Sequence, residues 1–364
     1  MIKDLITIRH SILYNKYKSS YNTAVIDFST HSFFLYIIFQ LFNKKYQILL
    51  PFLIPLLTLM LNRTFIVFHD CVHNSYTPNK SLNYVLATVT GVLIHASPNW
   101  ILDHDTHHLT NGNLDNKMHY FFNETVNYTE KQYNKFSEIG KFWYRVYKHP
   151  IVFFILFPFV YFSILQRFMY ITKKLYYGYK IRGSLGYIII NHSINNIGII
   201  VLYYYLKKYE LLNYYILSLW ISNINEFIIF HNQHTFNPSY VVENNKWSMK
   251  DSGIIGSSFI QFPYYSKYFF MGVEYHHVHH MNSKIPGYHL QEYHEEVVKT
   301  STIFDNVVKL GMVDCYNNLW LMCYSEDCKK YITLSTFQKS GAKQLRSLGG
   351  RDPLTPELRS FCSC

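Results

Sequence analysis

Long apolar stretches alternate with polar segments along the chain up to about residue 230. Four of these stretches come close to the roughly 20 residues that a helix needs to cross a bilayer: 24–42, 47–68, 186–206 and 211–230. Two others are shorter, as is typical of helices that lie in the membrane interface: 82–98 and 150–165. The pattern predicts an all-α integral membrane protein whose four transmembrane helices form two hairpins, with two additional interfacial helices.

Three short clusters of histidine lie beside the apolar segments. The first cluster has the spacing i, i+4, and the other two have i, i+3, i+4, which puts the side chains on one face of a helix. A single pair would be weak evidence, and a histidine-rich tract can bind metal loosely through composition alone. Three clusters, each with helical spacing, indicate a specific metal-binding site rather than loose binding. Its candidate ligands are His69, His73, His104, His107, His108, His276, His279 and His280.

The clusters also restrict the topology. Histidines that share one metal site must lie on one side of the membrane, so an even number of crossings must separate any two clusters. Segment 82–98 therefore cannot cross. We also assign 150–165 to the interface, because it is the shortest of the three apolar segments before the third cluster and carries Pro158. The basic residues between 167 and 182 then lie on the cytosolic side, together with the histidines, which form a cytosolic cap.

Composition supports a membrane protein and limits its partners. Charged residues make up 16% of the chain and hydrophobic residues 49%, and the charged share is well below the usual quarter. The net charge of +11 would suit nucleic acid in a soluble protein, but here it favours anionic lipid, so we expect membrane lipid and no nucleic acid as partner. The composition shifts near residue 335. We expect one membrane domain over 1–334 and a flexible, non-catalytic tail over 335–364.

Two classes of metal protein fit the clusters. A histidine-rich metal transporter would place ionisable residues along its spans to form a path, whereas these clusters lie just outside the spans and favour an enzyme. Imidazole suits iron, zinc, copper and nickel alike, so the ligand type does not select the metal. Three acids beside the clusters are positioned to orient ring N–H groups: Asp70, Asp103 and Asp105. For Asp103, the role of a solvated interfacial acid is equally well supported.

Together the motifs resemble the membrane-bound fatty acid desaturases, in particular the acyl-lipid, delta-12/omega-6-like branch, over roughly residues 63–334. The first two boxes are HDCVH at 69–73 and HDTHH at 104–108, and the third lies in GVEYHHVHHMNSKIPGYHL at 272–290. A fourth element, FHNQHTFNPSY at 230–240, resembles the family's QHxF stretch and adds His234 as a ninth candidate ligand. We expect the neighbouring His231 to play a supporting part.

The resemblance implies an O2-dependent oxidoreductase that inserts a cis double bond into an acyl chain. Its cofactor would be two iron ions, its co-substrate O2, and its substrate an acyl-lipid or acyl-CoA. Two electrons would come from a separate donor of the cytochrome b5 or ferredoxin type. The active site would face the cytosol, at the endoplasmic reticulum of a eukaryotic cell or virus-infected eukaryotic host, or at the inner membrane of a bacterium. The alternative within the same group of enzymes is a sister di-iron lipid oxygenase, such as a hydroxylase, acetylenase or ketolase.

Three residues depart from the pattern of this branch. Asn237 stands where an acid is common, Glu274 where a small residue is usual, and Gly287 where Asn is common. None of these positions belongs to the candidate ligands. We expect the departures to change substrate preference or the surroundings of the histidines rather than the ligand set.

Overall fold

Long helices dominate the computed structural model, which describes residues 13–43, 46–115, 127–177 and 183–333. A helix stands at each of the four predicted spans: α2 (Tyr21–Asn43), α3 (Leu50–Val72, preceded by η1, Gln47–Leu49), α10 (Leu185–Lys208) and α11 (Leu212–His234). The β-structure of the described part consists of two small two-stranded sheets. The prediction of an all-α membrane protein is confirmed. The predicted tail, 335–364, lies outside the described residues.

Four helical stretches are long and apolar enough to cross a membrane. They are Tyr21–Asn43, Leu50–Val72, Ile151–Leu175 and Leu185–Lys208. Three coincide with predicted spans. The helix α11 is more polar because it carries Asn223, Asn225 and Glu226, yet it packs along α3, where Thr58 Oγ1 donates to the backbone oxygen of Ser218 at 3.3 Å.

The segment that we expected to end at residue 165 is longer, so that boundary was wrong. It comprises η4 (Ile151–Leu156), α8 (Phe157–Val160), η5 (Tyr161–Leu165) and α9 (Gln166–Tyr177). The helix continues through basic residues because distant parts of the chain satisfy them. The Arg167 guanidinium donates to Asn195 and to the His95 backbone oxygen, and Lys173 Nζ lies 2.6 Å from Asp103 Oδ2.

The contacts at both ends of this long segment bear on its topology. Near its start, the Phe154 ring lies 5.0 Å from the His231 ring. Near its end, Lys173 pairs with Asp103, which directly precedes His104. Both ends therefore lie close to sequence neighbours of candidate ligands, since His231 precedes His234 by three residues, and this favours a helix that does not carry the chain across the membrane. The interfacial placement stays a prediction.

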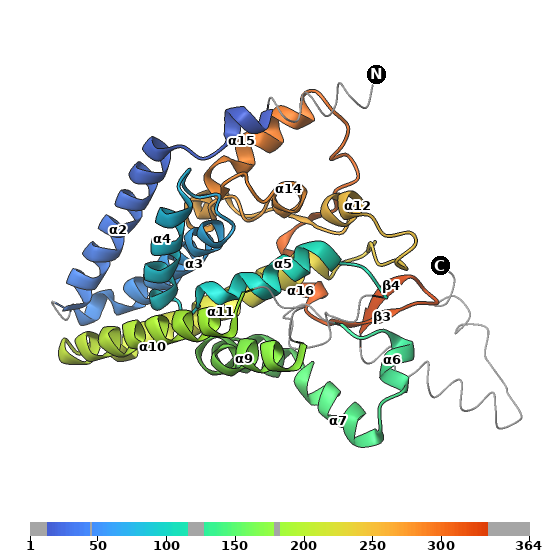
Figure 1. The fold of residues 1–364 in the computed structure, drawn as a ribbon, viewed down its shortest axis with the longest axis horizontal. Helices are drawn as coiled ribbons and strands as arrows, with labels where there is room; N and C mark the ends of the chain where they lie inside the picture. Colours follow the sequence, from blue (N-terminus) through green and yellow to red (C-terminus); the bar gives the residue numbers. More distant parts are fainter. Residues whose placement is uncertain (1–12, 44–45, 116–126, 178–182, 334–364) are drawn as a thin grey trace, which may run out of the picture.

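The other short segment, 82–98, does not form one straight helix. It begins in α4 (Lys80–Leu93), which a bend of 105° separates from η2 (Pro98–Trp100) and α5 (Ile101–Thr110). The bend depends on Gly91, whose backbone oxygen accepts from Ala96 N at 2.9 Å. A Cβ at this position would lie 2.2 Å from the Ala96 oxygen. The chain thus turns sharply and brings α5, with the second histidine cluster, back to the end of α3 (Figure 1).

Short elements build a cap over the ends of α3 and α11 (Figure 1). We define the cap as residues 235–333. Its helical elements are α12 (Met249–Ile254), η7 (Tyr264–Ser266), α13 (Lys267–Phe270), α14 (His276–Met281), α15 (Gly287–Val298) and α16 (Met312–Asn318). The strands β1 (Phe259–Ile260) and β2 (Lys309–Leu310) pair in parallel, and β3 (Leu321–Ser325) pairs antiparallel with β4 (Lys330–Thr333). Two further helices, α6 (Glu130–Asn134) and α7 (Glu138–Tyr147), pack beside the β3–β4 hairpin.

A buried lysine follows α7. Lys148 is 1% exposed; its Nζ donates to Asn127 Oδ1 at 3.0 Å and lies 4.1 Å from the centre of the Phe153 ring. Burial lowers the pKa of Lys148 from its ordinary 10.5 to about 7. Between these two values the unfolded chain binds more protons than the folded chain, so this residue makes stability increase with pH from about 7 towards 10.5.

Lys148→Met is therefore expected to raise the free energy of unfolding at pH 7 and below, by on the order of a few kcal/mol. The gain should shrink as the pH rises from 7 towards 10.5 and vanish above it, where the wild-type amine is neutral in both states. Thermal unfolding of both proteins in detergent, followed over pH 6 to 10, measures the difference. A gain that does not change with pH would mean that packing alone explains it.

Candidate metal centre

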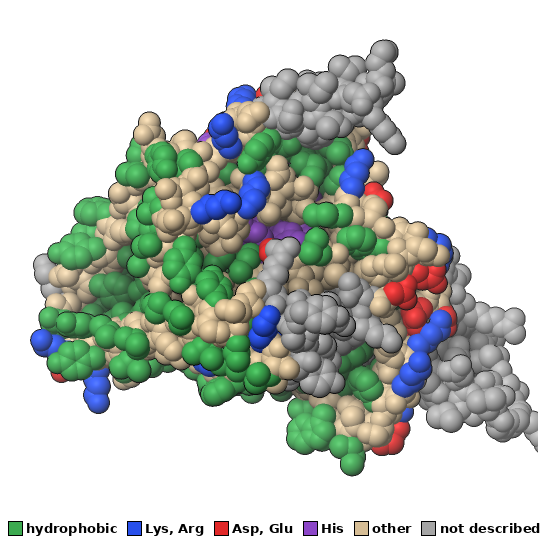
Figure 2. Space-filling model, viewed as in Figure 1, with side chains coloured by type: hydrophobic (Ala, Val, Ile, Leu, Met, Phe, Trp, Pro, Cys, Tyr) green, Lys and Arg blue, Asp and Glu red, His purple; other side chains and the backbone are tan. Residues whose placement is uncertain are grey.

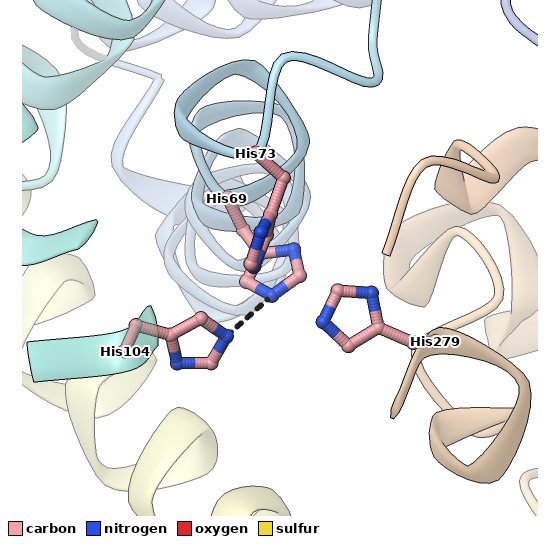
Figure 3. A group of neighbouring side chains, drawn as sticks. All are labelled: His69, His73, His104 and His279. Atoms are coloured by element: carbon pink, nitrogen blue, oxygen red, sulfur yellow. Dashed lines mark hydrogen bonds between the residues drawn. The ribbon is translucent and has the colours of Figure 1, made fainter. Parts of the chain in front are cut away.

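The first group of imidazoles combines three helices. His69 and His73 lie at the end of α3, His104 lies on α5 and His279 lies on α14. One ring nitrogen from each of the four comes within 4.8 Å of all the others. Figure 3 shows the rings converging on a common centre, with His69 Nε2 and His104 Nε2 3.1 Å apart.

The second group lies beside the first and also draws on three helices. His107 comes from α5, His234 from the end of α11, and His276 and His280 from α14, again with ring nitrogens within 4.8 Å of one another. His234 Nε2 lies 2.9 Å from His107 Nε2 and 2.8 Å from His276 Nε2. His276 and His280, four residues apart on α14, belong to this group, whereas His279 belongs to the first, because adjacent residues of a helix point about 100° apart.

His108 lies between the two groups. Its Nε2 is 3.1 Å from His104 Nε2 and 3.0 Å from His279 Nε2, both in the first group. Its ring stacks on that of His280 in the second group, with 4.2 Å between ring centres. The structure thus brings all nine predicted histidines together, five around one centre and four around the other.

The donor set fits two metal ions. His107 Nε2 faces both His234 and His280, at 2.9 and 3.2 Å, and a neutral imidazole has only one N–H, so hydrogen bonds cannot satisfy every such contact. Nitrogens about 2.1 Å from an ion and at right angles to each other stand roughly 3 Å apart, as they do here. Burial, followed by the neighbouring imidazoles, holds the pKa of His276, His279 and His280 well below its usual range. These rings are neutral, as metal ligation requires.

Two ligand candidates are oriented through their second ring nitrogen. The Asp70 carboxylate lies 3.3 Å from His69 Nδ1 and also accepts from the Gly287 N–H at 2.6 Å. His234 Nδ1 donates to the backbone oxygen of Gly256 at 3.0 Å. Such contacts fix each ring so that its Nε2 would face a bound ion. The contact with His69 fits the orienting role predicted for Asp70, which stays a prediction.

The other two acids have different surroundings. Asp103 pairs with Lys173 at 2.6 Å, and this contact ties α5 to α9. Asp105 lies close enough to Lys284 to raise the pKa of that lysine, although burial, the larger effect, lowers it. The Lys284 ammonium in turn donates to the backbone oxygen of His73. The orienting role of Asp103 and Asp105 stays a prediction.

Two nearby histidines belong to neither group. His231 Nε2 donates to the backbone oxygen of Asn318 at 2.9 Å, and its ring packs on Phe154. His277 Nε2 lies 2.9 Å from His294 Nδ1, and its ring packs 4.7 Å from Phe304. Each helix thus turns one histidine away from the centre.

A cavity reaches the histidines from between α3 and α11, with about 620 Å³ of empty space when the adjoining open solvent is included. Its wall is mostly apolar and includes histidines of both groups. It is lined by Phe65, Ile66, His69, Asp70, Trp100, His104, Phe162, Glu226, Phe227, Ile229, Phe230, Gln233, Val273, His276, His279, Gly287 and Leu290.

Sequence reasoning missed two aromatic residues of this wall. The Trp100 ring stacks on His104, with 4.1 Å between centres. The Phe230 ring lies 5.0 Å from His107 and 5.6 Å from His234. A signal was present for Phe230, because it precedes His234 by four residues and therefore shares its helical face.

Local structure explains two of the three departures from the family pattern. Asn237 Nδ2 donates to the Tyr331 backbone oxygen and Asn237 Oδ1 accepts from the Tyr331 N–H, both at 2.9 Å. An acid would place a carboxylate against that oxygen. Gly287 has no room for a side chain, since a Cβ would lie 2.5 Å from the Met271 backbone oxygen. Nothing in the structure explains Glu274.

Comparison with known proteins agrees with the geometry. The sequence profile described as "Fatty acid desaturase" matches residues 46–302. A "Fatty acid desaturase" of Bacillus subtilis (strain 168) is 31% identical over 283 residues, which cover 75% of this chain and 74% of that protein. The "sn-1 acyl-lipid omega-3 desaturase (ferredoxin)" of Nostoc sp. (strain 36) is 30% identical over 95 residues, 25% of each chain. The resemblance seen in the motifs is confirmed: this chain belongs to the fatty acid desaturase family.

Proposed function

We propose that the chain is an O2-dependent acyl desaturase that binds two iron ions. The first ion would be held by His69, His73, His104, His108 and His279, and the second by His107, His234, His276 and His280. One observation carries the proposal: histidines of both groups form part of the wall of a single apolar cavity. A chain of methylene groups in that cavity would lie directly against the metal centre.

When bound, the iron pair supplies the oxidant for unactivated C–H bonds, which no side chain provides. Overall, two neighbouring methylene groups lose two hydrogen atoms. Together with two external electrons and two protons, these reduce O2 to two water molecules. The residues of this chain position the substrate. Phe65, Phe227 and Phe230 surround the acyl chain and exclude water, while Asp70 and the Gly256 carbonyl hold two of the imidazoles in place.

The cavity indicates the substrate class, and a relative suggests the type of electron donor. The cavity suits an acyl chain of a lipid or acyl-CoA, since only a few polar side chains interrupt its wall. We propose a separate donor of the ferredoxin or cytochrome b5 type. The name of the Nostoc relative, which includes ferredoxin, supports the first of these.

We also propose that the histidines face the cytosol and that residues 1–334 form one multi-pass membrane domain. The long helices α3 and α11 both end at the metal centre, so they run in the same direction across the membrane. Each follows a helix of the opposite direction, α2 or α10. Two hairpins with their connections on the far side account for this arrangement. In a eukaryotic cell the membrane would be the endoplasmic reticulum, and in a bacterium the inner membrane.

Expression of the chain in a host, followed by gas chromatography of its fatty acids, tests the function. A new monounsaturated or diunsaturated acid is expected with the wild type and not with His279→Ala. Hydroxylated, acetylenic or keto products would favour the sister oxygenase. No new product in either case, together with increased metal content of the cells, would favour a transporter.

The end of the cavity provides a further prediction. On α11 the lining residue farthest from His234 is Glu226, about 12 Å away along the helix axis. Its Oε1 accepts from Asn62 Nδ2 at 2.7 Å, and this contact joins α11 to α3 where the cavity wall stops. Glu226→Ala should lengthen the cavity. The preference for chains longer by a methylene or two should rise roughly tenfold, since one methylene in a pocket is worth about 1–3 kcal/mol.

The chain-length distribution of the unsaturated products measures this change. Glu226→Gln is the matched control, because its amide oxygen can still accept from Asn62 and its size is unchanged. The cavity does not end at Glu226 if the Ala and Gln variants give the same distribution as the wild type.

A further inference from the structure

The helix α7 exposes an apolar face. Ile139 is 73% exposed, Phe142 51% and Trp143 61%. Their spacing of i, i+3 and i+4 places them on one side of the helix. Charged residues occupy other positions, with Lys141 paired to Glu138 at 2.7 Å. Three large, exposed apolar side chains on one side of a ten-residue helix indicate a surface that binds a partner.

The apolar face cannot turn towards the protein, because the opposite face is already fixed. Tyr144 is 6% exposed and its hydroxyl donates to the Met322 backbone oxygen at 2.7 Å. Its ring also packs 5.4 Å from Tyr128 and from Tyr133. The helix is therefore held in one rotation, with Ile139, Phe142 and Trp143 directed outwards.

The position of α7 in the chain identifies the partner. Only three residues separate the end of α7 from the apolar helix Ile151–Leu175. That helix also exposes apolar side chains at its start, with Ile151 56% and Leu156 48% exposed. Hydrophobic side chains are visible over α7 at the lower edge of the molecule in Figure 2. The exposed apolar surface thus continues from α7 into a segment that is itself suited to lipid.

We propose that α7 lies in the surface of the bilayer, with Ile139, Phe142 and Trp143 inserted at the boundary between headgroups and acyl chains. Tryptophan and phenylalanine are enriched at this depth, and amphipathic helices bind there through their apolar face. Lys141 is neutralised by Glu138, so the contact rests on apolar side chains more than on charge. It should therefore form on zwitterionic lipid as well as on anionic lipid.

The membrane contact of α7 would help to position the metal centre. Directly after α7, Lys148 binds Asn127, and Asn127 Nδ2 donates to Thr235 Oγ1 at 3.1 Å. Thr235 follows His234, a member of the second group. Through these hydrogen bonds, a helix α7 that is bound to the bilayer would help to hold Thr235, and with it the neighbouring His234, in place.

Tryptophan quenching in lipid nanodiscs tests the contact without reference to activity. Nanodiscs of phosphatidylcholine brominated on the acyl chains should quench Trp143, so the quenchable emission should be clearly smaller in Trp143→Phe than in the wild type. Trp247→Phe is the matched control. Trp247 lies in the cap and its indole donates to the Asn111 backbone oxygen, so the loss of Trp247 should leave the quenchable emission unchanged.

A second probe avoids the removal of an aromatic residue. An environment-sensitive fluorophore on Ile139→Cys should shift to the blue in these nanodiscs. The background carries Cys328→Ser, which removes the exposed thiol among residues 13–333, together with Cys362→Ser and Cys364→Ser. The same fluorophore on Lys141→Cys should shift less. The proposal is overturned if Trp143→Phe retains the full quenchable emission, or if position 139 gives the emission of an aqueous probe. Contact that appears only with anionic lipid would overturn its apolar basis.

Discussion

Replacement of His276 by Ala is expected to abolish the unsaturated product and to lower bound iron from two ions per chain to about one. His276 Nε2 lies 2.8 Å from His234 Nε2 in the second group, while the first group keeps all of its imidazoles. The loss of product should exceed about 100-fold, the upper range for changes to groups that only orient a ligand. Product analysis in the expressing host and metal analysis of the purified protein measure the two effects.

The matched control is the neighbouring residue. His277→Ala removes an equally buried imidazole from the same helix, but one that faces His294 and Phe304. It should lower stability and keep both metal ions. Retention of product or of two iron ions by His276→Ala would remove this residue from the ligand set.

The second large effect concerns the end of α11. His234→Ala should lose activity and metal from the second group, because His234 Nε2 lies within 2.9 Å of the nitrogens of His107 and His276. His231→Ala should keep its iron and part of its turnover. That side chain binds the Asn318 backbone oxygen and supports the packing of Phe154.

Iron content and turnover of the two purified variants separate these roles. The reverse pattern, with iron lost from His231→Ala and kept in His234→Ala, would show that the ligand lies one helical turn earlier than proposed. Equal loss from both variants would indicate that the end of α11 unfolds, which circular dichroism detects.

The sequence alone was enough to predict that these histidines lie together, because local spacing places them on the same side of short helices. The intervals i, i+3 and i+4 within short helices bring His104, His107 and His108 to one side. The same spacing could not assign each residue to an ion. His107 and His108 belong to different groups because of how α5 lies against α14, and this arrangement depends on contacts between residues about 170 apart in the chain.

Features that depend on distant partners escaped prediction. The helix after Ile151 continues past residue 165 because Asn195 and Asp103, from other helices, satisfy Arg167 and Lys173. The hydrogen bond between Glu226 and Asn62 at the end of the cavity joins residues 164 apart in the chain. By contrast, the bend after α4 coincides with a glycine in the sequence, Gly91. Any side chain at this position would collide with the Ala96 oxygen.

The most direct test of the metal centre is the iron content of the purified wild-type protein, measured by mass spectrometry of the metals together with quantitative amino-acid analysis. Two groups of imidazoles whose nitrogens converge predict two iron ions per chain in the active preparation. A preparation that makes unsaturated product with one iron ion or none per chain would contradict the account.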